Sequence, residues 1–312
     1  MLILEQEHSP LIELESGNKT RTVTFTANGE YLVSGDEKKV RVWRVDDGKQ
    51  VATMAAGLVN CLAVSKDGRW IAAGAYSGEM FVWDAQREYK RAFSLEGYYV
   101  NGLDFSPDST HLLAASFNRT VTTWDVANQE SSLSLRFKHN DGLVAAKYSP
   151  QGDKIAVATS KSIRVYSSGD GRLLVNISAE VTTWYNTGLL WSNDHLFVVS
   201  KDKIKQIDAS SGATVSEWSV PGSDSSSCIA LLQQGKFIAY STIRTVTLWD
   251  TDEHTQLDLI QHTQNIRSIA ISPDERSLAI AGEYGKITIG RLSRITASIV
   301  LFYYSCSDRV AA

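Results

Sequence analysis

The residues that could do chemistry are scattered along the chain and do not form a recognisable catalytic motif. The six histidines are His8, His111, His139, His195, His254 and His262. The 312 residues contain no HExxH, paired CxxC, GxSxG or P-loop pattern. A metal site would need several histidines to converge, and most carboxylates fall in turn sequences, where bonding to the local backbone is their usual role. We therefore predict no catalytic residue, no metal site and no cofactor, and we expect a protein that is not an enzyme.

Cysteine content and charge limit the cellular compartments and the kinds of partner to be expected. Cys61, Cys228 and Cys306 are an odd, widely spaced set, which favours a reducing compartment over a disulfide framework. The N-terminus lacks the basic start of a secretion signal, and the apolar run Ile299–Tyr304 is too short to cross a bilayer. With a net charge of −4, no global basic field would attract nucleic acid. We expect a cytoplasmic protein, with the nucleus as the alternative, that binds neither nucleic acid nor membrane.

One stretch, Asn101–Val126, contains a complete sheet-forming unit. Its first segment, Leu103–Ser106, alternates apolar and polar residues as a half-buried strand does. Ser106–Ser109 then reads as a turn, because Pro107 presets φ and Asp108 can bond its own backbone. Two further strands follow, and the second of them ends in Trp124-Asp125. The rest of the chain consists of imperfect copies of this unit.

Two independent markers count the copies. The third-strand position is held by Trp43, Trp83, Trp124, Tyr166, Ile207, Trp249 and Gly290, in steps of 40 to 42 residues. The first-turn position is held by Thr26, Ser65, Ser106, Ser149, Ser192, Leu232 and Ser272. Seven copies with a period near 40 and three or four short strands each are the sequence signature of propeller blades. Residues 1–312 are thus predicted to form one closed unit.

The copies resemble the WD40-repeat family through their third strands and first turns. The matching third strands are Val82–Ala85 (VWDA), Thr123–Val126 (TWDV) and Leu248–Thr251 (LWDT), and the turns read FSPDS, YSPQG and ISPDE. The resemblance implies an all-β fold, a seven-bladed β-propeller of four-stranded antiparallel blades. It says little about function, because one fold hosts many roles.

The blades are predicted at about residues 20–54, 58–95, 98–137, 141–177, 183–218, 226–260 and 266–292. Two segments compete to complete the last blade. Pro10–Leu14 keeps the offset of a fourth strand, and Thr296–Phe302 occupies the sequence position where that strand belongs. Family members often close the ring with an N-terminal strand, so we favour Pro10–Leu14. The C-terminal segment would then add a fifth strand, fold back on the ring or stay loose.

The resemblance also implies a buried set of His, Ser, Asp and Trp in each blade. Counting from the turn serine finds His139 and His262 at the His position. Counting back from the Trp position finds Asn118 in blade three and no Asp in any blade, so these networks are expected to be eroded. The tryptophans expected in the structural core are Trp43, Trp83, Trp124 and Trp249.

The loops carry large aromatic residues, which is unusual for a purely solvated surface. In this fold the turns between strands two and three and the connections between blades share one face. The residues predicted to bind protein there are Tyr76, Tyr99, Phe117, Trp184, Tyr185 and Tyr284, with Tyr98 alongside. Such residues are typical interface anchors. We hypothesise a monomeric propeller that displays this face to partner proteins as a scaffold. The alternative is a reader of a small ligand or modified peptide, with an aromatic cluster at the propeller mouth.

Overall fold

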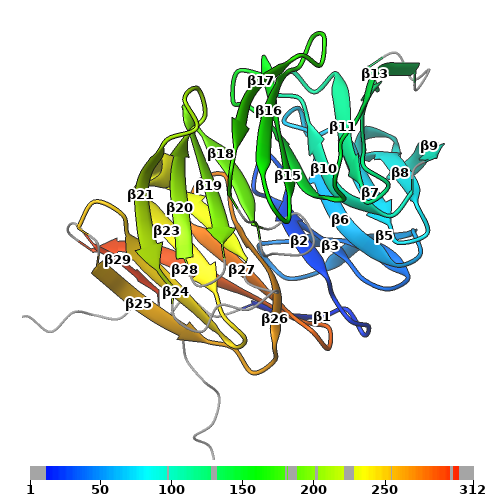
Figure 1. Cartoon of the computed structure of the whole chain (residues 1–312). Coiled ribbons are helices and arrows are strands. Elements are labelled where there is room, and N and C mark those ends of the chain that lie inside the picture. The colour runs from blue at the N-terminus through cyan, green and yellow to red at the C-terminus, as the bar shows by residue number, and fades with distance from the viewer. Residues whose placement is uncertain are drawn as a thin grey trace, which may run out of the picture.

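The chain forms a ring of antiparallel sheets with almost no helix (Figure 1). The computed structural model describes residues 12–96, 98–127, 132–179, 181, 188–200, 203–220, 228–253, 255–295 and 298–301. Within these ranges the helical elements are two single turns of 3-10 helix, η1 (Ala85–Arg87) and η2 (Gln233–Gly235). No helix in the same ranges is long and apolar enough to span a bilayer. The seven sheets confirm the predicted seven-bladed β-propeller.

Each blade consists of four strands in sequence order. Blade one contains β2 (Thr22–Phe25), β3 (Tyr31–Gly35), β4 (Lys39–Arg44) and β5 (Gln50–Ala55), and blade two contains β6 (Val59–Val64), β7 (Trp70–Ala75), β8 (Glu79–Asp84) and β9 (Lys90–Glu96). Blade three contains β10 (Val100–Phe105), β11 (His111–Ser116), β12 (Thr120–Asp125) and β13 (Ser132–Lys138). Blade four contains β14 (Leu143–Tyr148), β15 (Lys154–Thr159), β16 (Ile163–Ser167) and β17 (Leu173–Ile177).

The last three blades follow the same order, except that the seventh is completed from the other end of the chain. Blade five contains β18 (Leu189–Ser192), β19 (His195–Ser200), β20 (Lys203–Asp208) and β21 (Thr214–Ser219). Blade six contains β22 (Ile229–Leu232), β23 (Phe237–Ser241), β24 (Thr245–Asp250) and β25 (Thr255–Gln261). Blade seven contains β26 (Ile266–Ile271), β27 (Ser277–Gly282) and β28 (Lys286–Ile295), with β1 (Ile12–Glu15) as its fourth strand.

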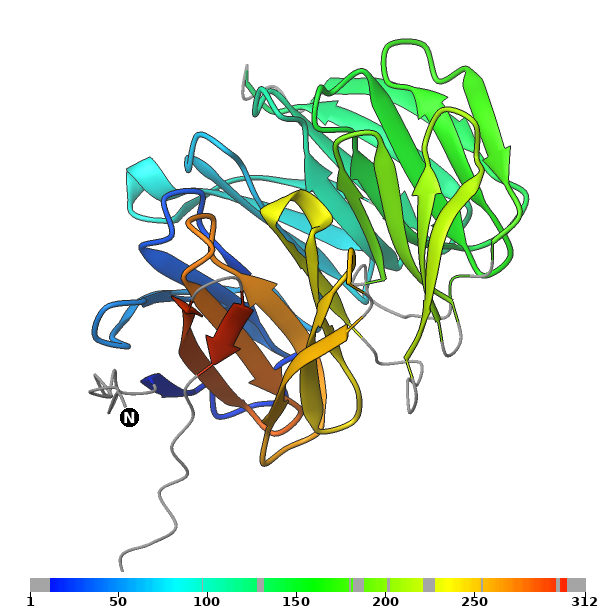
Figure 2. The ribbon, with the colours of Figure 1, turned by 90° about the vertical axis from the view of Figure 1, so that its left-hand side faces the viewer.

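The ring closes through the pairing of β1 with β28, with Ile12 opposite Ile289 and Glu15 opposite Lys286. This strand takes the place that the sequence assigned to Pro10–Leu14, of which Pro10 and Leu11 lie outside the described residues. Near the C-terminus, β29 (Ser298–Leu301) pairs with the far end of β28 as a fifth strand. Figure 2 shows the first and last strands on the same side of the ring. Because β1 and β27 pair with its two sides, the inner part of β28 has no open edge.

Burial explains the composition of the strands. The second strand of each blade lies between two neighbours and two adjacent blades, so β7 (WIAAGA) is buried at every residue. Outer strands such as β5 and β21 are mostly exposed, and their sequences contain polar as well as apolar residues. The predicted turns are present: in blade three the His111 amide donates to Ser106 Oγ over 2.9 Å, and the Thr110 amide donates to Asp108. Each blade thus combines an apolar inner half with a polar rim.

Polar contacts link the blades to one another. Asn101 Nδ2 donates to the Leu143 carbonyl over 2.9 Å, and the Tyr148 amide donates to Asp104 over 2.9 Å, so both bonds join blades three and four. Across the closure, the Val23 amide donates to Ser268 Oγ over 3.1 Å. Because these groups are buried or partly buried, leaving them unpaired would be costly. The bonds fix the rotation of each blade against the next, and so hold the loops at the ends of the blades in place.

Candidate functional site

One face of the ring is formed by the connections between strands two and three and between successive blades. Strand direction alternates within each blade, so these two kinds of connection come together at one end. Backbone hydrogen bonds join them: the Tyr76 amide donates to the Leu58 carbonyl over 2.8 Å, and the Phe117 amide donates to the Tyr99 carbonyl over 3.0 Å. The loops that carry the predicted aromatic residues are therefore held by their neighbours. We call this end of the ring the loop face.

Three of the predicted binding residues form a continuous row of rings on the loop face. The ring centroids of Tyr76 and Tyr99 lie 4.3 Å apart, and those of Tyr99 and Phe117 lie 5.5 Å apart, with both pairs tilted. Tyr76 is 52% exposed and Phe117 is 48% exposed, while Tyr99 between them is partly buried. We call these three residues the aromatic row. It crosses from blade two to blade three with one side of each outer ring open to solvent.

The backbone under the aromatic row is specialised. Tyr99 has a φ of 46°, a left-handed conformation that is uncommon for a residue other than glycine. This conformation directs its ring between the other two. Beside Phe117, a Cβ added to Gly142 would lie 3.1 Å from the Phe117 ring, so the glycine of the next connection lets the ring lie close to the backbone. The row is thus positioned by blades two to four together.

Two further aromatic residues of the loop face are described, and both are exposed. Tyr284 is 65% exposed on the loop between β27 and β28 of blade seven, and its amide donates to Gln264 Oε1 over 2.9 Å. Tyr98 precedes the row and is exposed. Trp184 and Tyr185 lie outside the described residues. Sequence reasoning missed Ile243, an exposed residue on the blade-six loop of the same face, because only aromatic residues were taken as anchors.

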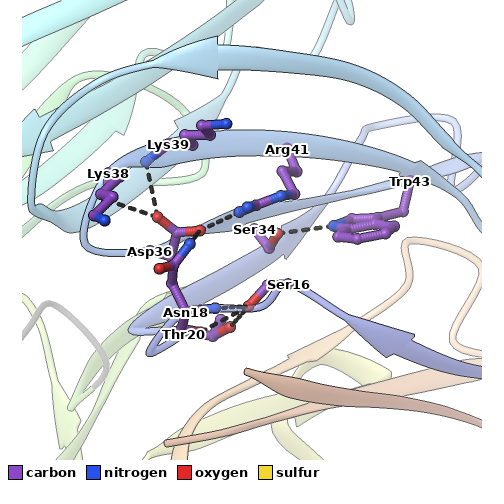
Figure 3. A network of polar contacts seen from close by, with 9 residues as sticks. All are labelled: Ser16, Asn18, Thr20, Ser34, Asp36, Lys38, Lys39, Arg41 and Trp43. Carbon is purple, nitrogen blue, oxygen red and sulfur yellow. Dashed lines mark hydrogen bonds and ion pairs between the residues drawn. The ribbon is translucent and has the colours of Figure 1, made fainter. Parts of the chain in front are cut away.

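The polar network of blade one corrects one sequence prediction (Figure 3). Counting back from the Trp position predicted no buried Asp of the family's set in any blade, and this was wrong for Asp36 of blade one. Asp36 is 1% exposed, accepts hydrogen bonds from the Lys38 and Lys39 amides over 2.6 and 2.8 Å, and forms an ion pair with Arg41. The count missed it because Asp36 lies seven residues before Trp43. The network is therefore structural and closes the β3–β4 turn.

The two family-position histidines are buried and do not face one another. His139 packs edge-on to Tyr166 with centroids 6.3 Å apart, and neither of its ring nitrogens has a hydrogen-bond partner in the described part of the chain. His262 accepts from the Gln264 amide over 3.1 Å, and its Nε2 is unpaired. Burial lowers the pKa of both side chains below the ordinary value. Both rings are therefore buried and neutral at neutral pH.

The central channel contains a cavity of about 310 Å³ lined by the innermost strands. Its charged side chain is Lys147, which pairs with Asp104 over 3.3 Å. Cys61 also lines it, and burial raises the pKa of its thiol to about 12, so the reactive thiolate is not formed at neutral pH. In the part of the chain that the structure describes, no group of three His, Cys, Asp or Glu residues is placed to hold a metal ion. Among the described lining residues, the ionisable side chains are thus a paired lysine and a protonated thiol.

The marker tryptophans differ in burial. Trp43 and Trp83 are 6% and 2% exposed, whereas Trp124 and Trp249 are only partly buried against the neighbouring clusters. All four pack in or against hydrophobic clusters, and the last two are less deeply buried than the first two. Trp124 Nε1 donates to Thr122 on its own strand over 3.1 Å, so this ring stays nearer the surface. Trp249 Nε1 has no hydrogen-bond partner among the described residues.

The closed ring of seven four-stranded blades defines a β-propeller. Sequence comparison points to one family of such propellers. The WD40 model (WD domain, G-beta repeat) matches residues 9–44, 48–84 and 89–125, which contain β1 of blade seven and most strands of the first three blades. Together with the four further blades of the structure, the matched repeats support a WD40-repeat family member.

Several WD-repeat proteins are similar to the chain. It is 22% identical to the transcriptional corepressor LEUNIG_HOMOLOG of Arabidopsis thaliana, over 88% of this chain and 35% of the corepressor. It is 21% identical to WD repeat-containing protein 18 of Danio rerio, over 92% of this chain and 73% of the relative. It is 33% identical to WD repeat-containing protein SL1-17 of Schistosoma mansoni, over 49% of this chain and 52% of the relative. The chain thus spans only about a third of the corepressor's length.

Proposed function

We propose that this propeller is a non-enzymatic scaffold that binds a partner protein through the loop face, with the aromatic row at the centre of the contact. The observation that carries the proposal is the row itself: Tyr76, Tyr99 and Phe117 touch in series and still present exposed surface. Large aromatic side chains bury much area and lose little conformational entropy, so they dominate interface energies. The names of the relatives, among them a corepressor and a pre-mRNA-processing factor, are consistent with work in protein assemblies.

Rigidity supports the same proposal. The loops under the row are held by inter-loop backbone bonds and by the left-handed Tyr99, and the blades beneath them form a closed ring. A binding surface that is already ordered loses little entropy when the partner arrives. The free protein therefore presents the rings in a conformation ready for contact.

The ring spacing does not favour the alternative of a cage for a methylated lysine. A cation binds over an aromatic face within about 6 Å of the centroid, and a cage needs several faces around one space. Tyr76 and Tyr99 are in direct contact at 4.3 Å, so no such group fits between them. The row is better suited to an extended apolar contact with a protein. A monomeric propeller located in the cytoplasm or the nucleus completes the proposal.

Affinity capture with matched variants tests the proposal. Tyr76→Ser with Phe117→Ser removes both exposed ends of the row. Leu173→Ser with Val215→Ser removes two equally exposed apolar side chains from the outer strands β17 and β21. We expect the first variant to lose partners that wild type and the second variant both retain, with all three giving the same circular dichroism spectrum. Identical partner profiles for all three would refute the role of the row.

A further inference from the structure

A second region of the loop face, between blades seven and one, is cationic. A small cavity of about 110 Å³ is lined there by Lys19, Thr20, Arg21, Arg267 and Glu283. Lys19 and Arg21 come from the segment that leads from β1 into blade one, Arg267 from β26, and Glu283 from the β27–β28 loop. Three cations and one carboxylate therefore surround a space large enough for a carboxylate group and bound water.

The one carboxylate of this cavity is already engaged. Arg267 donates to Glu283 over 2.7 Å, and Asn265 donates to it over 3.2 Å. The hydrogen bond from Arg267, with a further contribution from Lys19, lowers the pKa of Glu283, which is therefore ionised at neutral pH. Even with this charge counted, the cavity lining has an excess of positive charge. Arg244, exposed at the edge of the region, adds to it and donates to Asn265 over 3.1 Å.

Two exposed apolar side chains flank this cationic cavity. Tyr284 is 65% exposed next to Glu283, and Ile243 is 51% exposed next to Arg244. The backbone holds both loops: the Ile266 amide donates to the Ile243 carbonyl over 2.7 Å, and the Tyr284 amide donates to Gln264. An apolar contact beside a small cationic cavity is the pattern of an interface anchor with a charged neighbour.

The positive charge is local and does not follow from the composition. The whole chain carries a formal net charge of −4. At the opposite end of the ring, the described turns contain more acidic than basic residues, including Asp47, Asp67, Asp108, Asp153, Asp170 and Asp274. The field of the molecule is therefore polarised along the ring axis. An anionic partner would be attracted to the loop face and repelled from the other.

We propose that the region around Lys19, Arg21 and Arg267 binds an acidic segment of a partner protein, with a carboxylate in the cavity and an apolar side chain against Tyr284 and Ile243. This inference rests on the proposed function, because it assigns the chemistry of the partner that the loop face binds. Nucleic acid fits less well, since Glu283 lies in the cavity and the opposite face of the ring is acidic. Three cations and one carboxylate in the lining favour the carboxylate group of an acidic segment.

Selection from a displayed library of short random peptides tests the inference on the full chain. We expect peptides enriched on wild type to contain more Asp and Glu than the starting library. Synthetic versions should bind in fluorescence anisotropy and lose affinity when Glu is replaced by Gln. Against Lys19→Glu with Arg21→Gln their affinity should fall roughly tenfold at low salt, with the difference shrinking as salt rises. If the double variant melts early, Lys19→Glu alone replaces it, because Lys19 is exposed. Peptide affinity should fall in this single variant as well.

The control reverses two exposed charges on the opposite face, Lys66→Glu with Arg172→Glu, and should bind the peptides like wild type. No acidic enrichment, no binders at all, or equal affinity for wild type and the Lys19 variants would overturn the inference. The two proposals fail separately. If the selected peptides need Tyr76 and Phe117 for binding but are not enriched in acidic residues, the aromatic row remains a binding site. The proposal for the cationic cavity is then wrong.

Discussion

The indole nitrogen Nε1 of Trp43 donates a hydrogen bond to Oγ of Ser34 over 2.8 Å, with both residues buried in blade one (Figure 3). The strand registers put Ala73, Ala114 and Tyr240 at the position of Ser34 in blades two, three and six. Blade one thus has a bond that these three blades lack. The family's polar network survives best where the chain enters the ring.

Replacing Ser34 by Ala should lower the free energy of unfolding by about 1–3 kcal/mol, because the buried indole N–H loses its acceptor. Urea titration of wild type and variant measures the difference. Thr122→Val is the matched control: it removes the acceptor of the half-buried Trp124, where water can replace it, so its effect should be clearly smaller. Equal costs for the two changes would contradict the special role of the blade-one bond.

Asp36 and Arg41 should behave as a coupled pair. Arg41 is buried and pairs with Asp36, so Asp36→Ala leaves a buried cation unpaired and should cost about 3–5 kcal/mol. Adding Arg41→Met removes the stranded charge and should recover much of that loss. Urea titrations of the two single variants and the double variant give the coupling energy. Additive effects would show that the ion pair is not what stabilises the turn.

Much of the fold could be predicted because its signals are local and repeated. The turn at Ser106–Ser109 and the strand ending in Trp124-Asp125 recur with one period, and each copy specifies the same hydrogen bonds. The exposure of Tyr76 and Phe117 also followed from their place in the loops. The contact of both rings with Tyr99 did not, because it depends on a left-handed backbone and on the rotation of adjacent blades.

Polar partners were harder to predict than strands. A one-residue shift in the β3–β4 turn hid Asp36 from a count based on fixed spacing. The cationic cavity could not be seen either, because Lys19 and Arg267 are far apart in sequence and meet only when the ring closes.

Gly74→Ala should destabilise the propeller although alanine suits a strand. A Cβ at this position would lie 2.7 Å from Cγ1 of Val100 and 2.8 Å from Sγ of Cys61, across the junction of blades two and three. Overpacking of this kind costs about 1–3 kcal/mol. Gly169→Ala is the control, since nothing lies within 4 Å of its Cβ position. Thermal melting should separate the two variants; equal melting temperatures would mean that the blade junction can relax.

Stability should fall in mild acid because of His139. Burial first, and then Arg164, lower the pKa of its ring below the ordinary value of 6.5. The unfolded chain therefore takes up this proton at higher pH than the folded chain, and stability is lost as pH falls through 6.5 towards the folded-state pKa. His139→Leu should flatten the pH dependence of urea midpoints measured between neutral and mildly acidic pH. An unchanged slope in the variant would assign the effect to other groups, with His262 the next to replace.

The closing contact of the ring yields the last prediction. Leu14 of β1 is 2% exposed in a cluster with Val23, Trp43 and Ile287, so it joins blade seven to blade one. Leu14→Ala should cost about 2–5 kcal/mol, as for other buried leucines. Deleting residues 1–15 removes β1 altogether and exposes the edge of β28, so this protein should melt earlier and aggregate.

A deletion of residues 296–312, which removes β29, is the comparison for this closing contact. It leaves the pairing of β1 with β28 in place, so its effect on thermal melting and light scattering should be smaller. The reverse order, with a silent N-terminal deletion and a damaging C-terminal one, would show that the C-terminal segment closes the ring in solution. The Leu14→Ala variant separates the cases further, because only closure by β1 makes this single side chain important.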